Sequence, residues 1–295
     1  MDGRVHKKMK GIVIIGAGRL GTALARALSG AGMNIKAVAD SSPTAVSRAR
    51  RLVGRRRVFR DNVQAAGEGH VLFLCVPDST IGIVARELAS SGIAWRGKVV
   101  LHCSGLLSSS VLKPLRRRGA WTASCHPVRS FPAKGGEPHP FKGIPVGVEG
   151  QARAISRLGP VLRRLGAKPF VLRPADKPLY HAACSLASNH MVALLDMAQG
   201  LLVGLGFTKE KALAVLLPLA QGTLHDVNKV GTGAALTGPI VRGDVETVQE
   251  HLAALKKAPQ VREAYKTLGR RALRLAEKTV EAGKVKALRR LLAGK

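Results

Sequence analysis

The stretch GIVIIGAGRLG, residues 11–21, constrains the fold of this chain more than any other segment. Its apolar, β-branched first half predicts a short buried strand. Gly16, Gly18 and Gly21 follow at GxGxxG spacing, and the helical sequence TALARALSGAG comes directly after them. A strand, a glycine turn and a helix in this order are typical of the first unit of a dinucleotide-binding sheet.

Each glycine has a separate physical role in such a turn. The first permits the tight bend, the second lets the backbone approach a pyrophosphate, and the third lets the helix pack closely on the strand. The helix N-terminus then faces the negative charge of the phosphates. We therefore expect the turn to bind NAD or NADP, with Arg19 and Leu20 among its contacts.

Asp40 bears on the choice between these two cofactors. It ends the second expected strand, about 20 residues after the glycine turn, where an acidic side chain typically binds the ribose 2′-hydroxyl. A 2′-phosphate beside that carboxylate would be repelled, so NAD is slightly favoured. The serines that follow Asp40, or Arg48, are able to bind a phosphate instead, and NADP therefore stays open.

Up to residue 174, short β-branched runs alternate with helical stretches. Several of the runs are apolar throughout, as expected for central strands that are covered on both faces. The alternation predicts an α/β fold, with a doubly wound parallel-sheet Rossmann domain in residues 1–174. The expected strands cover residues 11–16, 34–40, 56–61, 70–77, 98–104, 120–127, 143–150 and 168–173.

From Lys177 onward the strand signals disappear. A length of 295 residues favours two domains, and the boundary is expected near the sequence RPADKP. We therefore expect residues 175–295 to form an all-α second domain that binds substrate and forms a dimer interface. The expected helices cover residues 178–204, 209–228, 244–257, 260–281 and 284–293.

In an open parallel sheet, ligands lie beyond the carboxyl ends of the strands. Three stretches are expected to meet there: CVPDST (75–80), LHCSG (101–105) and SCHPVRSF (124–131). The first two are expected to contact the cofactor, and the third to present a histidine and an arginine to the substrate. The residues concerned are Val76, Pro77, Ser104, Gly105, His126 and Arg129.

Two other interpretations apply to the same strand ends. The pairs His102–Cys103 and Cys125–His126 offer nitrogen and sulfur ligands of the kind that zinc prefers. Neighbours along a strand point to opposite faces, however, so the four cannot all share one site, and we expect no metal. The second interpretation treats His126 as a core histidine that donates to a backbone carbonyl.

The net charge of +30, from 48 Lys and Arg against 18 Asp and Glu, attracts anionic partners such as nucleotides and nucleic acid. The basic patches are not interleaved with aromatic residues, so nucleic acid is not the expected main partner. The four cysteines lack CxxC spacing and are expected to be reduced. No apolar run approaches the ~20 residues of a membrane span, and a cytoplasmic location without membrane contact is expected.

Six motifs taken together resemble a known family: GAGRLG, CVPD, LHCSGLLSS, HPVRSF, LYHAACSLASNH and ALTGPIVRGD. The chain resembles predicted NAD(P)-dependent oxidoreductases that join a Rossmann-like domain to a helical domain of unassigned function. These belong to the wider superfamily of 6-phosphogluconate dehydrogenases, hydroxyacid dehydrogenases, ketopantoate reductases and pyrroline-carboxylate reductases. The resemblance covers nearly the whole chain. It implies hydride transfer between NAD(P)H and a small ketone or imine that bears a carboxylate.

The motif LYHAACSLASNH, residues 179–190, places His181, Ser185, Ser188 and Asn189 on about a third of a helix circumference. The resemblance implies that this polar stripe faces the nicotinamide. Relatives carry a catalytic Lys followed one turn later by Asn. Here Asn189 would orient the substrate oxygen.

The resemblance implies that His181 stands at the position of this Lys, with Lys177 as the less favoured candidate. Histidine is suited to donating a proton near neutral pH, and His126 is the alternative donor. Ser185 is expected to contact the substrate. The structural alternative is that the serine and histidine side chains bond to backbone carbonyls within the helix.

A second motif of the helical half, LHDVNKVGTGAALTGPIVRGD, covers residues 224–244. The resemblance implies that its loop closes the substrate pocket, often from the partner subunit of an interlocked dimer. Thr237 would donate a hydrogen bond to substrate, Asn228 would contact it, and Arg242 would pair with its carboxylate. A solvated surface cation is the alternative interpretation of Arg242. A new helix is expected to begin near Asp244, a good N-cap residue.

Two other classes of function remain open at this point. Because no catalytic Lys is evident in the motif, the chain fits a catalytically inactive protein that binds NAD(P) and senses its state. Its charge also fits a basic nucleic-acid-binding protein, whose affinity would fall steeply with salt and ignore NADH.

Overall fold

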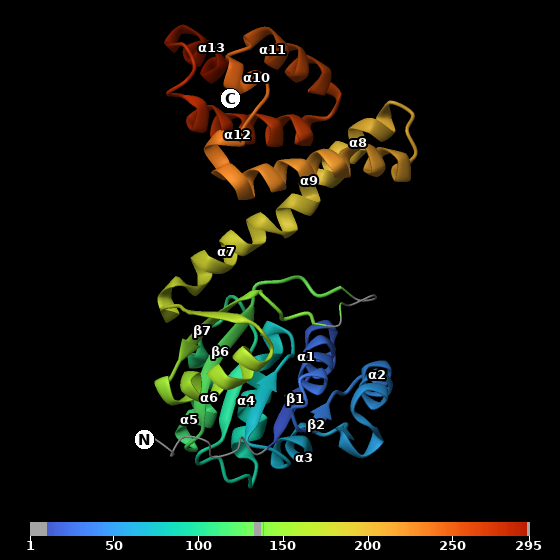
Figure 1. Ribbon diagram of the computed structural model, residues 1–295, viewed down its shortest axis with the longest axis vertical. Coiled ribbons are helices and arrows are strands. Elements are labelled where there is room, and N and C mark those ends of the chain that lie inside the picture. Colours follow the sequence, from blue (N-terminus) through green and yellow to red (C-terminus); the bar gives the residue numbers. More distant parts are fainter. Residues whose placement is uncertain (1–10, 133–136, 138, 294–295) are drawn as a thin grey trace. The chain divides into compact units, whose positions relative to one another are not determined.

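The computed structural model describes residues 11–132, 137 and 139–293. The chain divides into two compact units, with the division between Ser188 and Asn189. The first unit is an α/β domain and the second is helical, which confirms the predicted fold class (Figure 1). The division comes later in the chain than the boundary expected at residue 174, because the helix that follows that boundary is grouped with the first unit.

The first unit is built on one eight-stranded sheet with the order β3-β2-β1-β4-β5-β6-β7-β8. All eight expected strands are present. β6 and β7 pair antiparallel, whereas every other neighbouring pair is parallel. The strands are β1 Ile12–Ile15, β2 Ile35–Ala39, β3 Val58–Phe59, β4 Val71–Leu74, β5 Val99–His102, β6 Trp121–Pro127, β7 Pro145–Gly150 and β8 Lys168–Val171.

The prediction of a parallel sheet is therefore correct for the first six strands and wrong for the last two. A parallel pair needs a crossover connection, usually a helix. The segment between β6 and β7, residues 128–144, has no helical pattern in its sequence. The chain therefore returns beside β6 in the opposite direction, and β8 then follows β7 in parallel through a helix.

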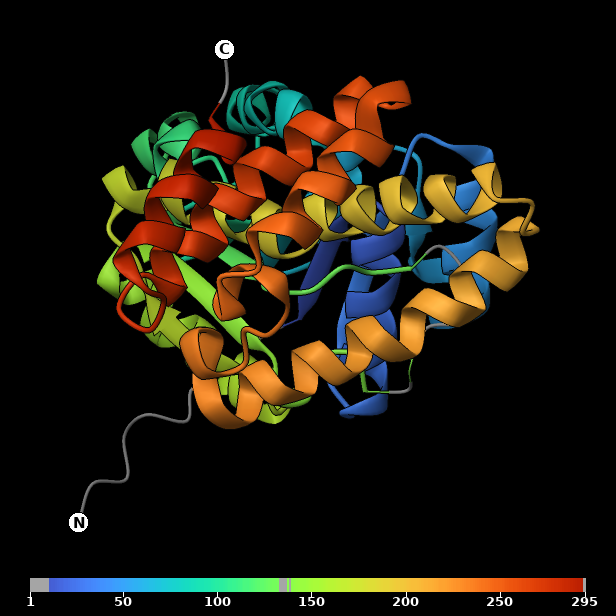
Figure 2. The same ribbon diagram turned by 90° about the horizontal axis from the view of Figure 1, so that it is seen from above.

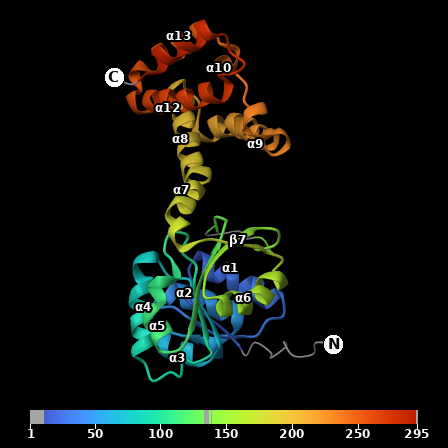
Figure 3. The ribbon, with the colours of Figure 1, turned by 90° about the vertical axis from the view of Figure 1, so that its left-hand side faces the viewer.

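Helices cover both faces of the sheet, as Figure 3 shows for α4 and α5 on one side and α6 on the other. Adjacent residues of β1 illustrate the consequence: Val13 belongs to one hydrophobic core and Ile14 to the other, and both have no exposed surface. One face is covered by α1 Arg19–Gly30, α2 Pro43–Val53 and α6 Ala152–Arg164, and the other by α3 Asn62–Gly67, α4 Asp78–Ser90 and α5 Lys113–Arg117.

The helix expected over residues 178–204 is two helices, α7 Lys177–Ala187 and α8 Asn189–Gly204. Ser188 leaves helical geometry, with φ −122° and ψ −72°. Serine and asparagine side chains compete for backbone hydrogen bonds, which favours a break at such a pair. The Ser188 hydroxyl pairs with that of Ser130 at 3.1 Å. The expected polar stripe is therefore divided, with Asn189 on the second helix.

The second unit contains six helices in its described part, drawn in gold to red in Figure 2. The three C-terminal ones pack around Val248, Leu252, Leu273 and Leu288. α9 extends further than expected, and Gly231, at φ +79°, breaks its regular geometry. The helices are α8 Asn189–Gly204, α9 Lys209–Ala234, α10 Pro239–Arg242, α11 Val245–Ala254, α12 Pro259–Ala276 and α13 Ala282–Leu292.

By length and composition, the stretch Pro174–Gly204 is apolar enough to cross a membrane. Its best window has a mean hydropathy of 1.2, and none of that window is buried. This differs from the expectation that no apolar run approaches the length of a span. The break at Ser188 divides the stretch, and a single stretch of this kind is weak evidence for a membrane span.

Candidate active site

The glycine turn is closely packed at its first and third glycines and open at its second. Gly16 has φ +98°, and a Cβ there would lie 2.5 Å from the carbonyl oxygen of Cys75. A Cβ on Gly21 would overlap the carbonyl oxygen of Gly16. Gly18 is the N-cap residue of α1. A Cβ added to Gly18 would have no atom within 4 Å. The open N-terminus of α1 therefore fits an anionic group.

A cavity of about 290 Å³ opens at this turn. It includes five of the expected cofactor residues, Gly16, Gly18, Asp40, Val76 and Pro77. The other five expected residues do not line it: Arg19, Leu20, Gly21, Ser104 and Gly105. The remaining lining residues are Ser41, Arg60, Asn62, Cys75, Thr80 and Val84.

The Asp40 carboxylate holds the glycine turn in place. One oxygen accepts a hydrogen bond from the backbone N–H of Ala17 at 2.6 Å, and the other accepts from the N–H of Ser42 at 2.8 Å. Asp40 therefore joins the end of β2 to the middle of the turn. The sequence predicts a different partner for this carboxylate, the hydroxyl of a ribose.

Lys177, the first residue of α7, lies fully buried at the ends of β5 and β6. Its Nζ donates to the carbonyl oxygen of Ser104 at 3.0 Å and to Oγ of Ser124 at 2.5 Å. Burial lowers the pKa of Lys177, although the nearby carboxylates of Glu149 and Asp78 oppose that shift. Through these two hydrogen bonds the Lys177 side chain joins the start of α7 to the loop after β5 and to β6.

Ser104 organises the loop after β5. Its Oγ donates to the carboxylate of Asp78 at 2.7 Å and accepts from the backbone N–H groups of Leu106 and Leu107. Together with Lys177, these bonds fix the path of the chain through Gly105. The hydroxyl expected at the nicotinamide is thus engaged within the protein.

Two histidines converge on Gly105. A Cβ on Gly105 would lie 2.5 Å from Cδ2 of His181 and 2.9 Å from Nε2 of His126. The two rings are perpendicular, with centroids 6.0 Å apart. Only a glycine allows both imidazoles to approach this strand end. The structure therefore brings together two of the candidate catalytic residues, His126 and His181.

Tyr180 also belongs to this cluster, although it is not among the candidates predicted from the sequence. Its hydroxyl lies 2.6 Å from Nδ1 of His126. Gly147, the neighbour of His126 on β7, makes room for it, since a Cβ there would lie 3.1 Å from the hydroxyl. The available signal was its position next to His181, but adjacent helical residues point about 100° apart and do not share a stripe.

The buried environment keeps His126 neutral. Burial lowers the pKa of His126 to about 4, and the positive charges of Lys177 and His181 act in the same direction. Burial also raises the pKa of the Tyr180 hydroxyl, which keeps its proton. The pair is therefore a neutral imidazole beside a protonated phenol.

The other candidate residues are not part of the cluster of His126, Tyr180 and His181. Arg129 pairs with the carboxylate of Glu137 at 2.8 Å and donates to the carbonyl of Pro140 at 3.2 Å. Ser185 lies half-buried on α7. Asp244 caps α11 by accepting from the N–H of Thr247, as expected. Four candidates belong to the second unit and remain predictions: Asn189, Asn228, Thr237 and Arg242.

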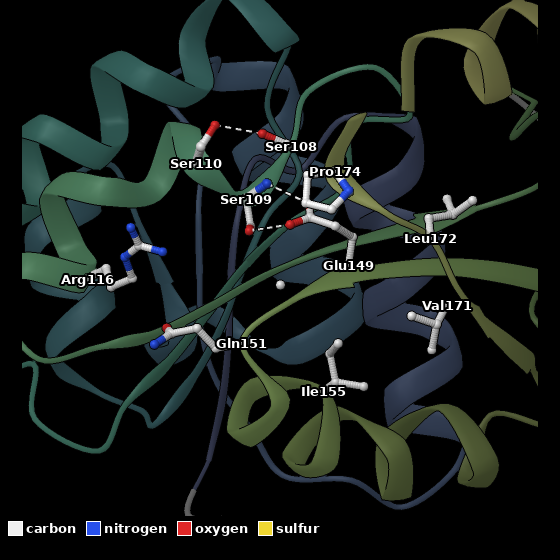
Figure 4. A pocket seen from close by; sticks show the side chains of 11 residues that line it. Ser108, Ser109, Ser110, Arg116, Glu149, Gln151, Ile155, Val171, Leu172 and Pro174 are labelled. Carbon is white, nitrogen blue, oxygen red and sulfur yellow. Dashed lines mark hydrogen bonds between the residues drawn. The ribbon is translucent and has the colours of Figure 1, made fainter. Parts of the chain in front are cut away.

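A second cavity, of about 320 Å³, lies apart from the glycine turn (Figure 4). The buried carboxylate of Glu149 reaches it and accepts from the backbone N–H and the hydroxyl of Ser109 at 2.7 and 2.6 Å. Arg116, Gln151 and Val171 also line it. Within the described residues, no three His, Cys, Asp or Glu side chains are arranged to hold a metal ion.

Two family models match the chain. Residues 2–127 match a Rossmann-like domain, and residues 144–272 match a domain of unknown function, DUF2520. This combination agrees with the resemblance to a Rossmann-like domain joined to a helical domain of unassigned function. None of the curated proteins compared with the chain matches it.

Solved structures share the fold over most of the chain. A provisionally assigned NADP oxidoreductase from Bacteroides fragilis is 22% identical, with a TM-score of 0.75, covering 90% of this chain and 98% of its own. A protein from Thermotoga maritima is 26% identical, with a TM-score of 0.70 and the same two coverages of 90% and 98%. A reductive aminase from Aspergillus terreus, solved with NADPH and ethyl-5-oxohexanoate, is 16% identical, with a TM-score of 0.65, covering 95% and 98%.

Proposed function

We propose that this protein is a reductase that transfers hydride from NAD(P)H to a small ketone or imine bearing a carboxylate. One observation carries the proposal. An open glycine turn and a cluster of His126, Tyr180 and His181 lie at the carboxyl ends of one sheet, where ligands of this fold bind. The likeness to an NADP oxidoreductase and to a reductive aminase with NADPH supports the same class of reaction.

The cofactor would be held by Gly16, Gly18 and Gly21, and it supplies the hydride. In this proposal the Tyr180 hydroxyl is the donor to Nδ1 of neutral His126, and Nε2, which lies near Gly105, then carries the proton and is a hydrogen-bond donor. A preorganised donor of this kind stabilises negative charge that develops on the substrate oxygen or nitrogen. His181 supplies the proton.

Three residues of the second unit also have roles in this proposal. Asn189 and Thr237 hold the reacting oxygen or nitrogen, and Arg242 pairs with the substrate carboxylate. Arg129 is the less favoured anchor because Glu137 already pairs with it. Lys177 contributes by fixing the loop of Ser104, without touching the substrate.

The test is NAD(P)H oxidation with a panel of keto acids and cyclic imines, followed by single-turnover kinetics of the best substrate. His181→Asn should slow the chemical step about 100-fold, the usual scale for loss of a general acid, with cofactor affinity unchanged. His251→Asn, an exposed histidine of α11, is the matched control. Tight cofactor binding without oxidation of any substrate would support the sensor alternative instead.

We also propose that the chain forms a homodimer through its helical domain. α8 and α9 contact each other, yet no residue of α8 is buried, and Val192, Val215 and Leu219 are exposed. Two such hairpins would bury these faces as a helical bundle. Sedimentation at several protein concentrations tests this, and flotation with lipid vesicles tests a membrane as the other apolar partner.

A further inference from the structure

We infer that Arg60, together with Ser41, binds the 2′-phosphate of NADP(H), so that the protein selects NADPH over NADH. This inference rests on the proposed function, because it assigns a specificity to the same cofactor site. It assigns a role to an arginine that lies outside the glycine turn and its helix.

Arg60 lies beside Asp40 at the carboxyl ends of two paired strands. β3 pairs with β2 through Ala39 and Phe59, and the N–H of Asp40 donates to the carbonyl of Phe59 at 3.3 Å. The next residue of each strand end is therefore Asp40 on one side and Arg60 on the other. In this fold the adenosine ribose binds beyond this end of the second strand.

The cavity of the glycine turn joins Arg60 to the expected path of the nucleotide. Gly16 and Gly18 line one part of that cavity, and Ser41 and Arg60 line another. Its volume of about 290 Å³ holds part of a dinucleotide. A nucleotide whose pyrophosphate lies on the turn would extend its ribose toward the guanidinium.

The Arg60 guanidinium is available for a ligand. It is exposed, and within the described part of the chain no side chain or carbonyl forms a hydrogen bond or an ion pair with it. A planar guanidinium is suited to two parallel hydrogen bonds with a phosphate. The exposed Ser41 adds a hydroxyl donor to the same cavity.

The carboxylate that would oppose a 2′-phosphate is already engaged. Both oxygens of Asp40 accept backbone N–H groups, from Ala17 and Ser42. These two donors face the negative charge, and the Arg60 guanidinium adds a positive charge on the neighbouring strand end. The repulsion expected between the Asp40 carboxylate and a 2′-phosphate is therefore offset by the two backbone N–H groups and by the Arg60 guanidinium, which the fold brings close to Asp40.

The experiment compares the affinities of NADPH and NADH, measured by fluorescence titration in the absence of substrate. The wild-type chain should bind NADPH at least about tenfold more tightly than NADH. Arg60→Gln should weaken NADPH about tenfold, the scale of one charge-assisted contact, and change NADH less than about twofold. Arg55→Gln, an exposed arginine that does not line the cavity, removes the same charge as a control.

Two further measurements sharpen the assignment. Adenosine 2′,5′-bisphosphate should bind Arg60→Gln about tenfold more weakly than the wild type, whereas AMP should bind both proteins equally. Asp40→Ala should weaken NADPH and NADH by similar factors, since it loosens the glycine turn that both need. A loss confined to NADH would instead place Asp40 on the ribose hydroxyls.

The outcomes separate this inference from the proposed function. If NADH binds as tightly as NADPH, or if Arg60→Gln leaves NADPH affinity unchanged, the assignment of Arg60 is overturned and the reductase proposal stands. If neither dinucleotide binds the wild-type chain, the proposed function is overturned together with it.

Discussion

Strand β1 and helix α8 are both apolar in sequence, but they differ in how far their residues are buried. All four residues of β1 are buried, and they divide between two cores on the two faces of the sheet. None of the 16 residues of α8 is buried. The first segment is enclosed by helices of its own unit, whereas the side chains of the second are exposed or half-buried.

The comparison shows that apolar composition alone does not reveal what covers a segment. Changes in the sheet should act on the stability of the chain itself. Changes in the α8–α9 hairpin should act on association and leave the folded chain intact.

A matched pair of truncations tests the distinction most directly. Ile14→Ala should lower the free energy of unfolding by about 2–5 kcal/mol, because it leaves a cavity in a closed core. Leu219→Ala, at a side chain that is 71% exposed, should change it by less than about 0.5 kcal/mol. Urea unfolding of both variants measures this, and equal losses would contradict the contrast between the two regions.

The buried histidines of the first unit predict a loss of stability in acid. Burial lowers the pKa of His102 to about 4, below its ordinary value of 6.5. The unfolded state therefore binds more protons, so the stabilisation present above pH 6.5 is lost as the pH falls toward 4. The loss approaches about 3 kcal/mol for such a shift. His102→Gln should flatten the profile of unfolding free energy between pH 7 and 4.5, and a profile as steep as that of the wild type would contradict the assignment.

Gly18→Asp should separate binding from stability within the first unit. A Cβ added to Gly18 would have no atom within 4 Å, so the fold should accept the change and the Tm should stay close to that of the wild type. A carboxylate at the open N-terminus of α1 would repel the pyrophosphate and weaken NADPH about 100-fold or more. Retained affinity would show that the nucleotide does not use this turn.

The smallest effect on the folded chain is expected for Val192→Glu on α8, whose side chain is 64% exposed. The dimer dissociation constant should rise at least about tenfold, because a carboxylate would replace apolar contact in the bundle. The circular dichroism spectrum should not change. Sedimentation of the variant beside Arg55→Gln measures the difference, and a monomeric wild-type chain would remove the dimer proposal.

Much of the fold was predictable because local patterns encode it. The eight strands and the turn of Gly16, Gly18 and Gly21 follow from periodicity and glycine spacing alone. The reversal of β7 and the break at Ser188 were missed, although the sequence carries a local signal for each: no helical pattern between β6 and β7, and a Ser-Asn pair inside the expected helix. Sequence periodicity indicates which residues share a face, but not where a helix stops.

The candidate site was predictable to a smaller extent. His126 and His181 were identified from their strand end and their helix, and the structure brings both to Gly105. Tyr180, Arg60 and the inward turn of Asp40 were not identified. Each depends on a contact between segments far apart in the chain, which no local spacing encodes.

The burial of Lys177 sets where the first unit can be separated from the rest of the chain. Its Nζ donates to Ser104 in the loop after β5 and to Ser124 in β6, near the carboxylate of Glu149. A fragment cut at residue 174 would lose this side chain and leave the Ser104 carbonyl and the Ser124 hydroxyl without their buried hydrogen-bond donor. An isolated first unit that retains its fold should therefore run through Ser188, so that α7 supplies Lys177.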